Sequence, residues 1–191
     1  MVPKQRITKE MVVDAAFELV RRDGMEKVTV KTLAESLGCS VQPIYSYCQS
    51  MDGLRAELAE RAAEFVHAYA AKAVDENDLF RSTGRAYVRL AKEEPHIFKL
   101  FLFRERQNIR SLNELYSSET NPEVAKLTAQ KLGLSIEAAR ELHLNMLIYT
   151  IGIGTVFAVT SPNLPEEEIF AQQERAYEAF LKNTREKDGN E

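Results

Sequence analysis

Apolar residues recur every three or four positions along most of the chain, the spacing that gathers them on one face of an α-helix. The first stretch is typical, because Val12, Ala16 and Leu19 share one face and charged residues lie between them. Gly, Pro and short polar runs separate successive stretches. The pattern predicts an all-α fold of about nine helices without a convincing strand. These helices span residues 8–22, 30–37, 41–47, 51–74, 78–94, part of 104–121, 122–133, 135–160 and 166–182.

Residues 29–47 read as two short helices joined by a tight turn. Thr29 and Ser40 precede the helices, and their hydroxyls suit the free N–H groups at a helix start. Gly38 can adopt the left-handed backbone that ends a helix. Ile44 is the predicted apolar contact from the second helix. This layout is typical of a helix-turn-helix, whose second helix enters the DNA major groove. The same layout also occurs in all-α proteins that bind no DNA, so the flanking sequence must decide.

The helices predict two domains, a small bundle at residues 1–48 and a larger helical domain at 49–191. The long helix 51–74 starts in the first domain and links it to the second. Pro95 is predicted to end the helix before it, because proline lacks the backbone N–H that a helix interior needs. The aromatic stretch 96–103 is too apolar for a surface, and the charged tail from Asn183 is predicted to fray.

Composition is ordinary for a soluble globular protein, with 45% apolar and 28% charged residues. The net charge is −4, but residues 1–50 hold seven Lys and Arg against six Asp and Glu, a net of +1. The first domain is thus compatible with local phosphate contacts. Lys4 and Arg6 form a short basic arm that either reaches DNA or is a disordered terminus.

The sequence predicts a cytoplasmic protein. The first ten residues contain no apolar secretory region. The apolar run 144–159 falls short of the roughly 20 residues that span a bilayer, so a buried helix and no membrane are predicted. Cys39 and Cys48 are too few for a disulfide framework. They are interpreted as small buried residues, with a redox switch as the alternative.

Catalysis is not indicated. His67, His96 and His143 lack the spacing of metal ligands, and there is no glycine-rich phosphate loop or serine elbow. We therefore predict no metal, no cofactor and no enzymatic activity.

A combination of positions between Thr8 and Leu58 is far more specific than the helix-turn-helix alone. It consists of Ala15, Ala16, Gly24, Thr29, Leu33, Ala34, Leu37, Gly38, Tyr45, Tyr47 and Leu54. In these residues the chain resembles the DNA-binding domain of the TetR/AcrR family of transcriptional regulators. The resemblance implies an all-α homodimer, most often a repressor, that binds a near-palindromic site on double-stranded DNA. It further implies that a small-molecule effector releases or modulates the regulator from the C-terminal domain.

The resemblance also assigns DNA-contacting positions. Gln42 is the best candidate base reader, because its amide can bond adenine N6 and N7 together. Tyr45 and Tyr47 match positions that contact the DNA backbone. The predicted DNA-binding set is Thr29, Lys31, Val41, Gln42, Pro43, Tyr45 and Tyr47. Two positions depart from the family pattern, since Cys48 stands where Phe is common and Met51 where a phosphate-binding Lys is common.

The helix through Leu142–Val159 is apolar nearly all round, so it needs cover on both sides. Gly152 and Gly154 would allow a neighbouring helix to approach closely. The last two long helices are therefore predicted to pair in a homodimer as a four-helix bundle. The alternative is that the same residues form intramolecular core.

An effector pocket is predicted from aromatic and polar residues on inward-facing stripes. Its candidates are Phe65, Tyr69, Tyr87, Phe98, Phe101, His143, Asn145 and Tyr149. Few charged residues fall on these stripes, which favours an apolar or aromatic effector. The alternative function is a helical ligand-binding or protein-interaction module whose three-helix head does not bind DNA.

Overall fold

The computed structural model describes residues 7–47, 50–73, 75, 78–106, 108–160 and 162–189. Every regular element in these residues is helical, which confirms the predicted all-α class. Lys4, Arg6, Cys48 and Val74, which figure in the sequence predictions, lie outside the described residues. The elements are α1 (Lys9–Asp23), the 3-10 helix η1 (Met25–Lys27), α2 (Val30–Ser36), α3 (Val41–Tyr47), α4 (Met51–Lys72), α5 (Leu79–Glu93), α6 (Pro95–Leu102), α7 (Leu112–Glu119), α8 (Pro122–Leu132), α9 (Ile136–Thr160) and α10 (Glu166–Asp188).

The described residues form ten α-helices where the sequence predicts about nine, and the additional helix is α6. Helix α5 ends at Glu93, Glu94 is the N-cap of the next helix, and Pro95 occupies the first position of α6. Proline suits that position because its missing N–H would have no partner inside the helix. Ile97, Phe98 and Phe101 of α6 are buried, as the apolar character of this stretch predicts, but Phe103 at its end is 74% exposed, so the prediction is wrong for that residue.

The last helix is longer than predicted, because α10 continues to Asp188 where the sequence indicates fraying from Asn183. The Asp188 carboxylate accepts the backbone N–H of Ser135 at 3.0 Å. The Ser135 hydroxyl in turn accepts the N–H of Ala138 at 3.1 Å and caps α9, as predicted. The same hydroxyl donates to the other oxygen of the Asp188 carboxylate at 2.5 Å. The bonds from the Ser135 hydroxyl and from its backbone N–H tie the end of α10 to the start of α9 and lower the pKa of Asp188.

The chain divides into two compact units. The head unit contains the described residues up to Tyr69 together with Leu90–Arg104. The body unit contains Ala70–Arg89 together with the residues from Glu105 onward. The sequence predicts a single boundary near residue 48. In the structure the chain passes from the head unit to the body unit within α4, and it returns to the head unit within α5.

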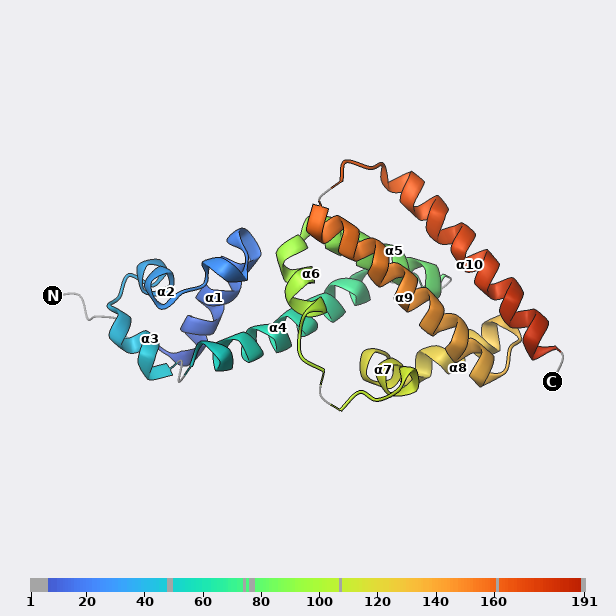
Figure 1. Cartoon of the computed structure of the whole chain (residues 1–191), viewed down its shortest axis with the longest axis horizontal. Helices are drawn as coiled ribbons and strands as arrows, with labels where there is room; N and C mark the ends of the chain where they lie inside the picture. The colour runs from blue at the N-terminus through green and yellow to red at the C-terminus, as the bar shows by residue number, and fades with distance from the viewer. Residues whose placement is uncertain are drawn as a thin grey trace. The chain divides into compact units, whose positions relative to one another are not determined.

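In the head unit, α1, α2 and α3 pack against one another, and α4 begins beside α3 (Figure 1). Val12, Ala16 and Val20 of α1 are fully buried. Leu33 of α2 and Ile44 of α3 are also fully buried. This small core fixes the helix-turn-helix to its supporting helices.

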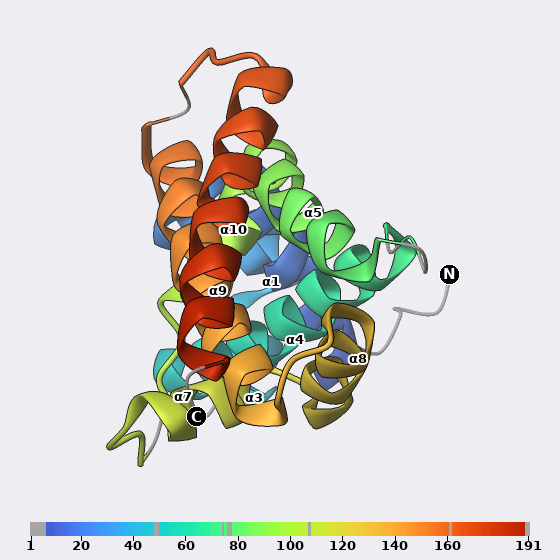
Figure 2. The ribbon, with the colours of Figure 1, turned by 90° about the vertical axis from the view of Figure 1, so that its right-hand side faces the viewer.

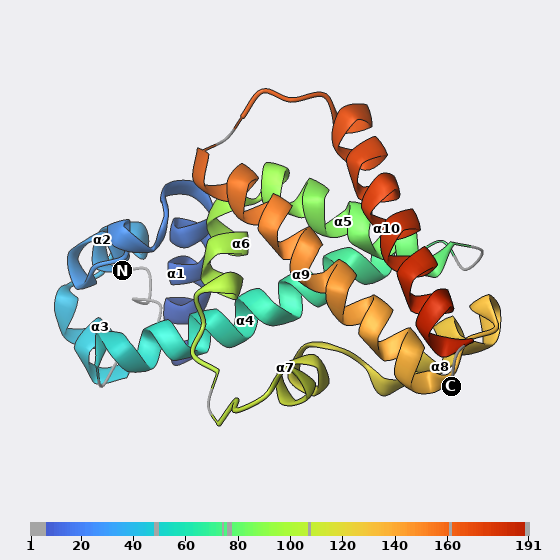
Figure 3. The same cartoon turned by 45° about the vertical axis from the view of Figure 1, so that its right-hand side comes forward.

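In the body unit, α10 lies alongside α9 (Figure 2). The short helix α8 lies against the first half of α9 (Figure 3). Leu142, Met146 and Tyr177 form a buried apolar cluster between α9 and α10. Phe80 and Phe180 pack against this cluster and extend it.

Candidate nucleic-acid interface

Two threonines build the start of α2. The Thr29 hydroxyl accepts the N–H of Thr32 at 3.1 Å, and the Thr32 hydroxyl accepts the N–H of Thr29 at 2.9 Å. This reciprocal arrangement is a capping box. The Thr32 hydroxyl donates to the carbonyl of Lys27 at 2.8 Å, which ties η1 to α2. The predicted cap at Thr29 is confirmed, and Thr32 is its partner.

The turn between α2 and α3 depends on Gly38. This residue has φ 62°, in the left-handed region that favours glycine. A Cβ at Gly38 would meet nothing within 4 Å, so backbone conformation and not space selects glycine here. The next N–H, that of Cys39, donates to the carbonyl of Ala34 at 3.0 Å and closes the end of α2.

Helix α3 is anchored on one side and open on the other. Ile44 is 0% exposed, whereas Val41 is 44% and Tyr45 65% exposed. Gln42 is exposed as well, and Pro43 is half-buried. The helix therefore presents an apolar group, an amide and a phenol outward from its first turns. These groups match the types that read base edges and contact phosphates.

Few positive charges accompany the exposed face of α3. The Lys31 side chain is 83% exposed and lies 4.0 Å from the carboxylate of Glu35, one turn further along α2. Tyr47, at the end of α3, is half-buried. Met51 is also half-buried and begins α4, so no cation stands at that position.

Ion pairs hold the head unit together, and the sequence patterns do not predict them. The Arg21 side chain of α1 donates through Nε to both oxygens of Glu94 at 2.9 Å, and its guanidinium lies 5.5 Å from the ring centre of Phe65. This hydrogen bond to the Glu94 carboxylate raises the pKa of Arg21. Asp14 of α1 pairs with Arg61 of α4. These contacts orient α1, against which α2 and α3 pack.

A surface hollow of about 600 Å³ also lies in the head unit. Its lining carries charges of both signs and includes no residue of α3. The lining residues are Leu19, Arg22, Asp23, Lys27, Thr32, Glu35, Ser36 and His96.

The eight predicted effector residues are divided between the two units. Phe65, Tyr69, Phe98 and Phe101 belong to the head unit, and Tyr87, His143, Asn145 and Tyr149 to the body unit. Phe98 and Phe101 are buried, and their tilted rings have centres 6.4 Å apart. The Tyr69 hydroxyl lies 2.5 Å from a carboxylate oxygen of Glu93.

His143 occupies an aromatic environment in the body unit. Its Nδ1 lies 2.9 Å from the Tyr116 hydroxyl. The rings of Phe80 and Tyr116 meet it edge-on, with centres at 5.4 Å and 5.3 Å. Burial lowers the pKa of His143 to about 4, so the imidazole is neutral at pH 7.

Among the described residues, no group of three or more His, Cys, Asp or Glu is placed to hold a metal ion. By length and composition, α9 is apolar enough to cross a bilayer, and 33% of its most apolar window is buried within the chain.

Comparisons with known proteins agree with this geometry. The family described as "Bacterial regulatory proteins, tetR family" matches residues 12–58. The HTH-type transcriptional regulator YobS of Bacillus subtilis is 28% identical over 107 residues, covering 54% of this chain and 56% of that protein. An HTH-type transcriptional repressor of Mycobacterium tuberculosis is 25% identical over 148 residues, covering 76% of this chain and 56% of the repressor. The matches thus span little more than half the length of these curated relatives.

Solved structures share the fold. A tetR-family transcriptional regulator from Streptomyces coelicolor has a TM-score of 0.68 at 16% identity, covering 95% of this chain and 83% of that one. A transcriptional regulator from Pseudomonas aeruginosa has a TM-score of 0.61 at 14% identity, covering 98% of each chain.

The capped α2, the Gly38 turn and the anchored α3 define a helix-turn-helix domain of the DNA-binding class. Within that class, residues 12–58 match the DNA-binding domain of the TetR family of bacterial regulatory proteins. The family resemblance predicted from the sequence is confirmed. The family is one of transcriptional regulators and not a class of enzymes.

Proposed function

We propose that the protein is a cytoplasmic, sequence-specific DNA-binding repressor that acts as a homodimer and responds to a small-molecule effector. The observation that carries the proposal is the geometry of α3. Ile44 fixes the helix to the head unit, and Gln42 and Tyr45 project from it into solvent. A helix held in this way can enter a major groove without disturbing its own support.

Each residue of the predicted DNA-binding set has a proposed role. Gln42 reads adenine through its amide, and Val41 and Pro43 contact thymine methyl groups. Tyr45, Tyr47 and Thr29 bond phosphate oxygens. Lys31 supplies a positive charge that attracts phosphates whatever the DNA sequence.

The proposed dimer surface is the outer face of α9. Ile148, Val156 and Val159 are 49%, 52% and 57% exposed, and they recur at helical spacing. A Cβ at Gly152, on the same face, would meet no described atom within 4 Å. An exposed apolar stripe of this kind is typical of a protein interface. Covered by a second copy, α9 and α10 would form a four-helix bundle and hold the two heads about 34–36 Å apart, on successive major grooves.

The proposed effector site lies in the body unit, near His143, Asn145, Tyr149 and Tyr87. Aromatic rings surround the neutral His143, and Tyr149 meets Phe180 edge-on with ring centres 6.3 Å apart. A charged ligand would lose its hydration there, so an apolar or aromatic effector is favoured. Its binding would change repression only if it favoured one conformational state over another.

The test is enrichment of bound DNA from a pool of random duplexes, followed by titration of the selected duplex at several salt concentrations. We expect a near-palindromic site, bound by two chains, with an affinity that falls steeply with salt. A pool that shows no enrichment, with or without candidate effectors, would instead support a helical ligand-binding module whose head is only structural.

A matched pair of variants identifies the interface. The double variant Gln42→Ala/Tyr45→Ala should abolish enrichment while the head stays folded, because both side chains point into solvent. The control is Gln130→Ala, which removes the same amide from an exposed position on α8 of the body unit. Gln130→Ala should select the same site as the wild type.

A further inference from the structure

Gln173 is a buried amide at the meeting point of three helices in the body unit. It is 6% exposed, and it projects from α10 toward α5 and α9. Its Nε2 donates to the carbonyl of Gly84 at 3.3 Å and to the Thr150 hydroxyl at 3.4 Å. Its Oε1 is buried and has no hydrogen-bond partner among the described residues. An unpaired buried oxygen costs stability, so apolar packing alone does not explain this side chain.

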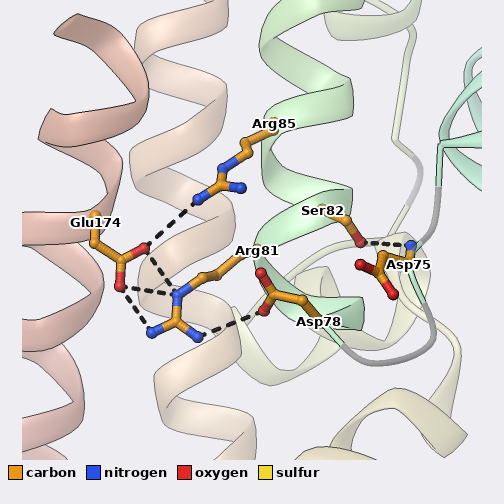
Figure 4. A network of polar contacts seen from close by, with 6 residues as sticks. All are labelled: Asp75, Asp78, Arg81, Ser82, Arg85 and Glu174. Atoms are coloured by element: carbon orange, nitrogen blue, oxygen red, sulfur yellow. Dashed lines mark hydrogen bonds and ion pairs between the residues drawn. The ribbon is translucent and has the colours of Figure 1, made fainter. Parts of the chain in front are cut away.

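Directly beside Gln173, a salt bridge joins the same two helices α5 and α10. Arg81 donates through Nε to both oxygens of Glu174 at 2.8 Å (Figure 4). A second arginine one turn along α5, Arg85, lies 3.9 Å from the same carboxylate. Asp78 completes the cluster at 3.4 Å from Arg81. The Arg81–Glu174 pair is bidentate, which specifies geometry as well as adding energy.

The pairing continues along both helices with matched spacing. Arg89 bonds Glu166 at 3.1 Å, and its guanidinium lies 5.1 Å from the ring centre of Phe170. Arg89 lies eight residues after Arg81, and Glu166 lies eight residues before Glu174. Both pairs therefore require α5 and α10 to run antiparallel. A displacement of α10 by one helical turn, about 5.4 Å, would separate both pairs. Arg85 already lies 3.9 Å from Glu174, so the buried contacts of Gln173 with Gly84 and Thr150 are what distinguish this register from one displaced by a turn.

Apolar side chains specify register weakly, because one buried leucine or valine can replace another after a one-turn shift. Single buried polar groups are known to fix register at a cost in stability. We propose that Gln173 and the Arg81–Glu174 pair form the register key of α10. They fix the position of α10 on α5 and α9 at the expense of stability. They thereby position the α9–α10 surface of the dimer, a consequence that rests on the proposed function.

The test compares two buried polar residues of α10. Gln173→Met removes the amide at similar volume, and Thr184→Val is the matched control. Thr184 is 2% exposed and its hydroxyl also has no partner among the described residues, but it is remote from the Arg81–Glu174 pair in sequence. Each variant removes an unpaired buried oxygen, so each should raise the Tm by about 2–4 °C.

Local order and assembly should separate the variants. In Gln173→Met, amide hydrogen exchange in residues 166–177 should become at least about threefold faster although the Tm rises. Its dimer should dissociate about tenfold more readily, measured by analytical ultracentrifugation. Thr184→Val should change neither quantity. Arg81→Gln should accelerate the same amides, which provides a second route to the register key.

Two results would overturn the register key. One is a Gln173→Met variant whose α10 exchange matches that of Thr184→Val, and the other is a Gln173→Met variant with a lowered Tm. A wild-type protein that stays monomeric at all concentrations would instead contradict the proposed dimer. The exchange comparison can still be made on that monomer, so the two failures are distinguishable.

Discussion

The exposed faces of α3 and α9 differ in chemistry more than in exposure. The outer face of α3 presents Gln42 and Tyr45, whose polar tips can bond bases and phosphates. The outer face of α9 presents Ile148, Val156 and Val159, which offer only apolar atoms. Side chains of similar exposure on the two helices therefore support the two different partners that we propose. A polar face suits hydrated DNA, and an apolar face suits another protein surface.

The two faces are also held differently. Helix α3 is short and relies on Ile44 and on the turn at Gly38. Helix α9 is long, and Leu142 and Met146 bury its opposite side against α10. The proposed reading helix belongs to one unit and the proposed dimer surface to the other, so mutations should be able to alter DNA contacts and assembly separately.

The largest effect should come from a substitution that blocks the apolar face of α9. Gly152→Arg places a long charged side chain where a Cβ meets no described atom of its own chain, so the monomer should fold normally. The proposed partner helix would clash with that side chain. Loss of the dimer converts two-headed binding into one-headed binding, and operator affinity should fall by about 10²–10⁴-fold. Ultracentrifugation and operator titration measure the two consequences.

The control for this surface is Leu127→Arg, at a position on α8 that is also exposed and apolar. It adds the same charge to the body unit on a helix outside the proposed dimer surface, and it should leave both assembly and operator affinity unchanged. If Gly152→Arg remained dimeric, the proposed assignment of the α9 face would be wrong.

The next largest effect should come from acid, which should destabilise the body unit through His143. The folded pKa of His143 is about 4, below the ordinary 6.5, so the unfolded state binds the extra proton between these values. Stability from the neutral His143 is thus complete above pH 6.5 and is lost as the pH falls toward 4. The loss approaches about 3 kcal/mol at an energy of about 1.4 kcal/mol per pKa unit.

Chemical denaturation at pH 7 and pH 4.5 measures this difference. His143→Phe should flatten the pH dependence in that window, and His67→Gln, at an exposed position of the head unit, should not. Hydrogen exchange at pH 4.5 should increase first around α9 in the body unit. An unchanged pH profile for His143→Phe would show that another group controls acid stability.

Local chemistry explains which parts of the fold the sequence predicts correctly. The cap at Thr29, the turn at Gly38 and the buried Ile44 all depend on residues within about ten positions of one another. Propensity and helical spacing carry that information directly. The α2–α3 segment is therefore predictable almost residue by residue, and the resemblance to a family adds the identity of its partner.

Long-range contacts explain what the sequence does not predict. Arg21 and Glu94 are 73 positions apart, and no periodic pattern links them. The same holds for Asp188, whose bond to Ser135 extends α10 beyond its expected end. Helix α6 was missed because Pro95 ends one helix and begins another, and apolar periodicity in so short a segment is ambiguous. The effector residues fall in both units for a similar reason, since α4 and α5 each pass from one unit to the other.

Removing the Gln42 amide tests the proposed role of the polar face of α3. Gln42→Ala should cost about 1–3 kcal/mol at one position of each half-site and relax the base preference there. Binding to unrelated sequences should be unaffected, because that binding depends on phosphate contacts. Competition between the selected duplex and duplexes substituted at single positions measures the change. A variant that selects an unchanged site would assign the reading role to Val41 or another residue.

The smallest effect should come from Lys31, whose charge is exposed and lies near Glu35. Lys31→Ala should weaken binding to all duplexes by a similar factor. It should also reduce the slope of log affinity against log salt by about 1, because one fewer phosphate is neutralised. Titration of specific and random duplexes across a salt series measures both quantities.

Glu35→Gln is the matched control for Lys31, because it removes the carboxylate that competes with phosphate for the lysine. It should strengthen binding slightly at low salt, where surface charges are least screened. Opposite shifts from the two variants would place Lys31 at the DNA backbone. Equal shifts of DNA affinity in one direction would mean that Lys31 and Glu35 act only through the stability of α2. DNA binding by α3 would then have less electrostatic contribution than proposed.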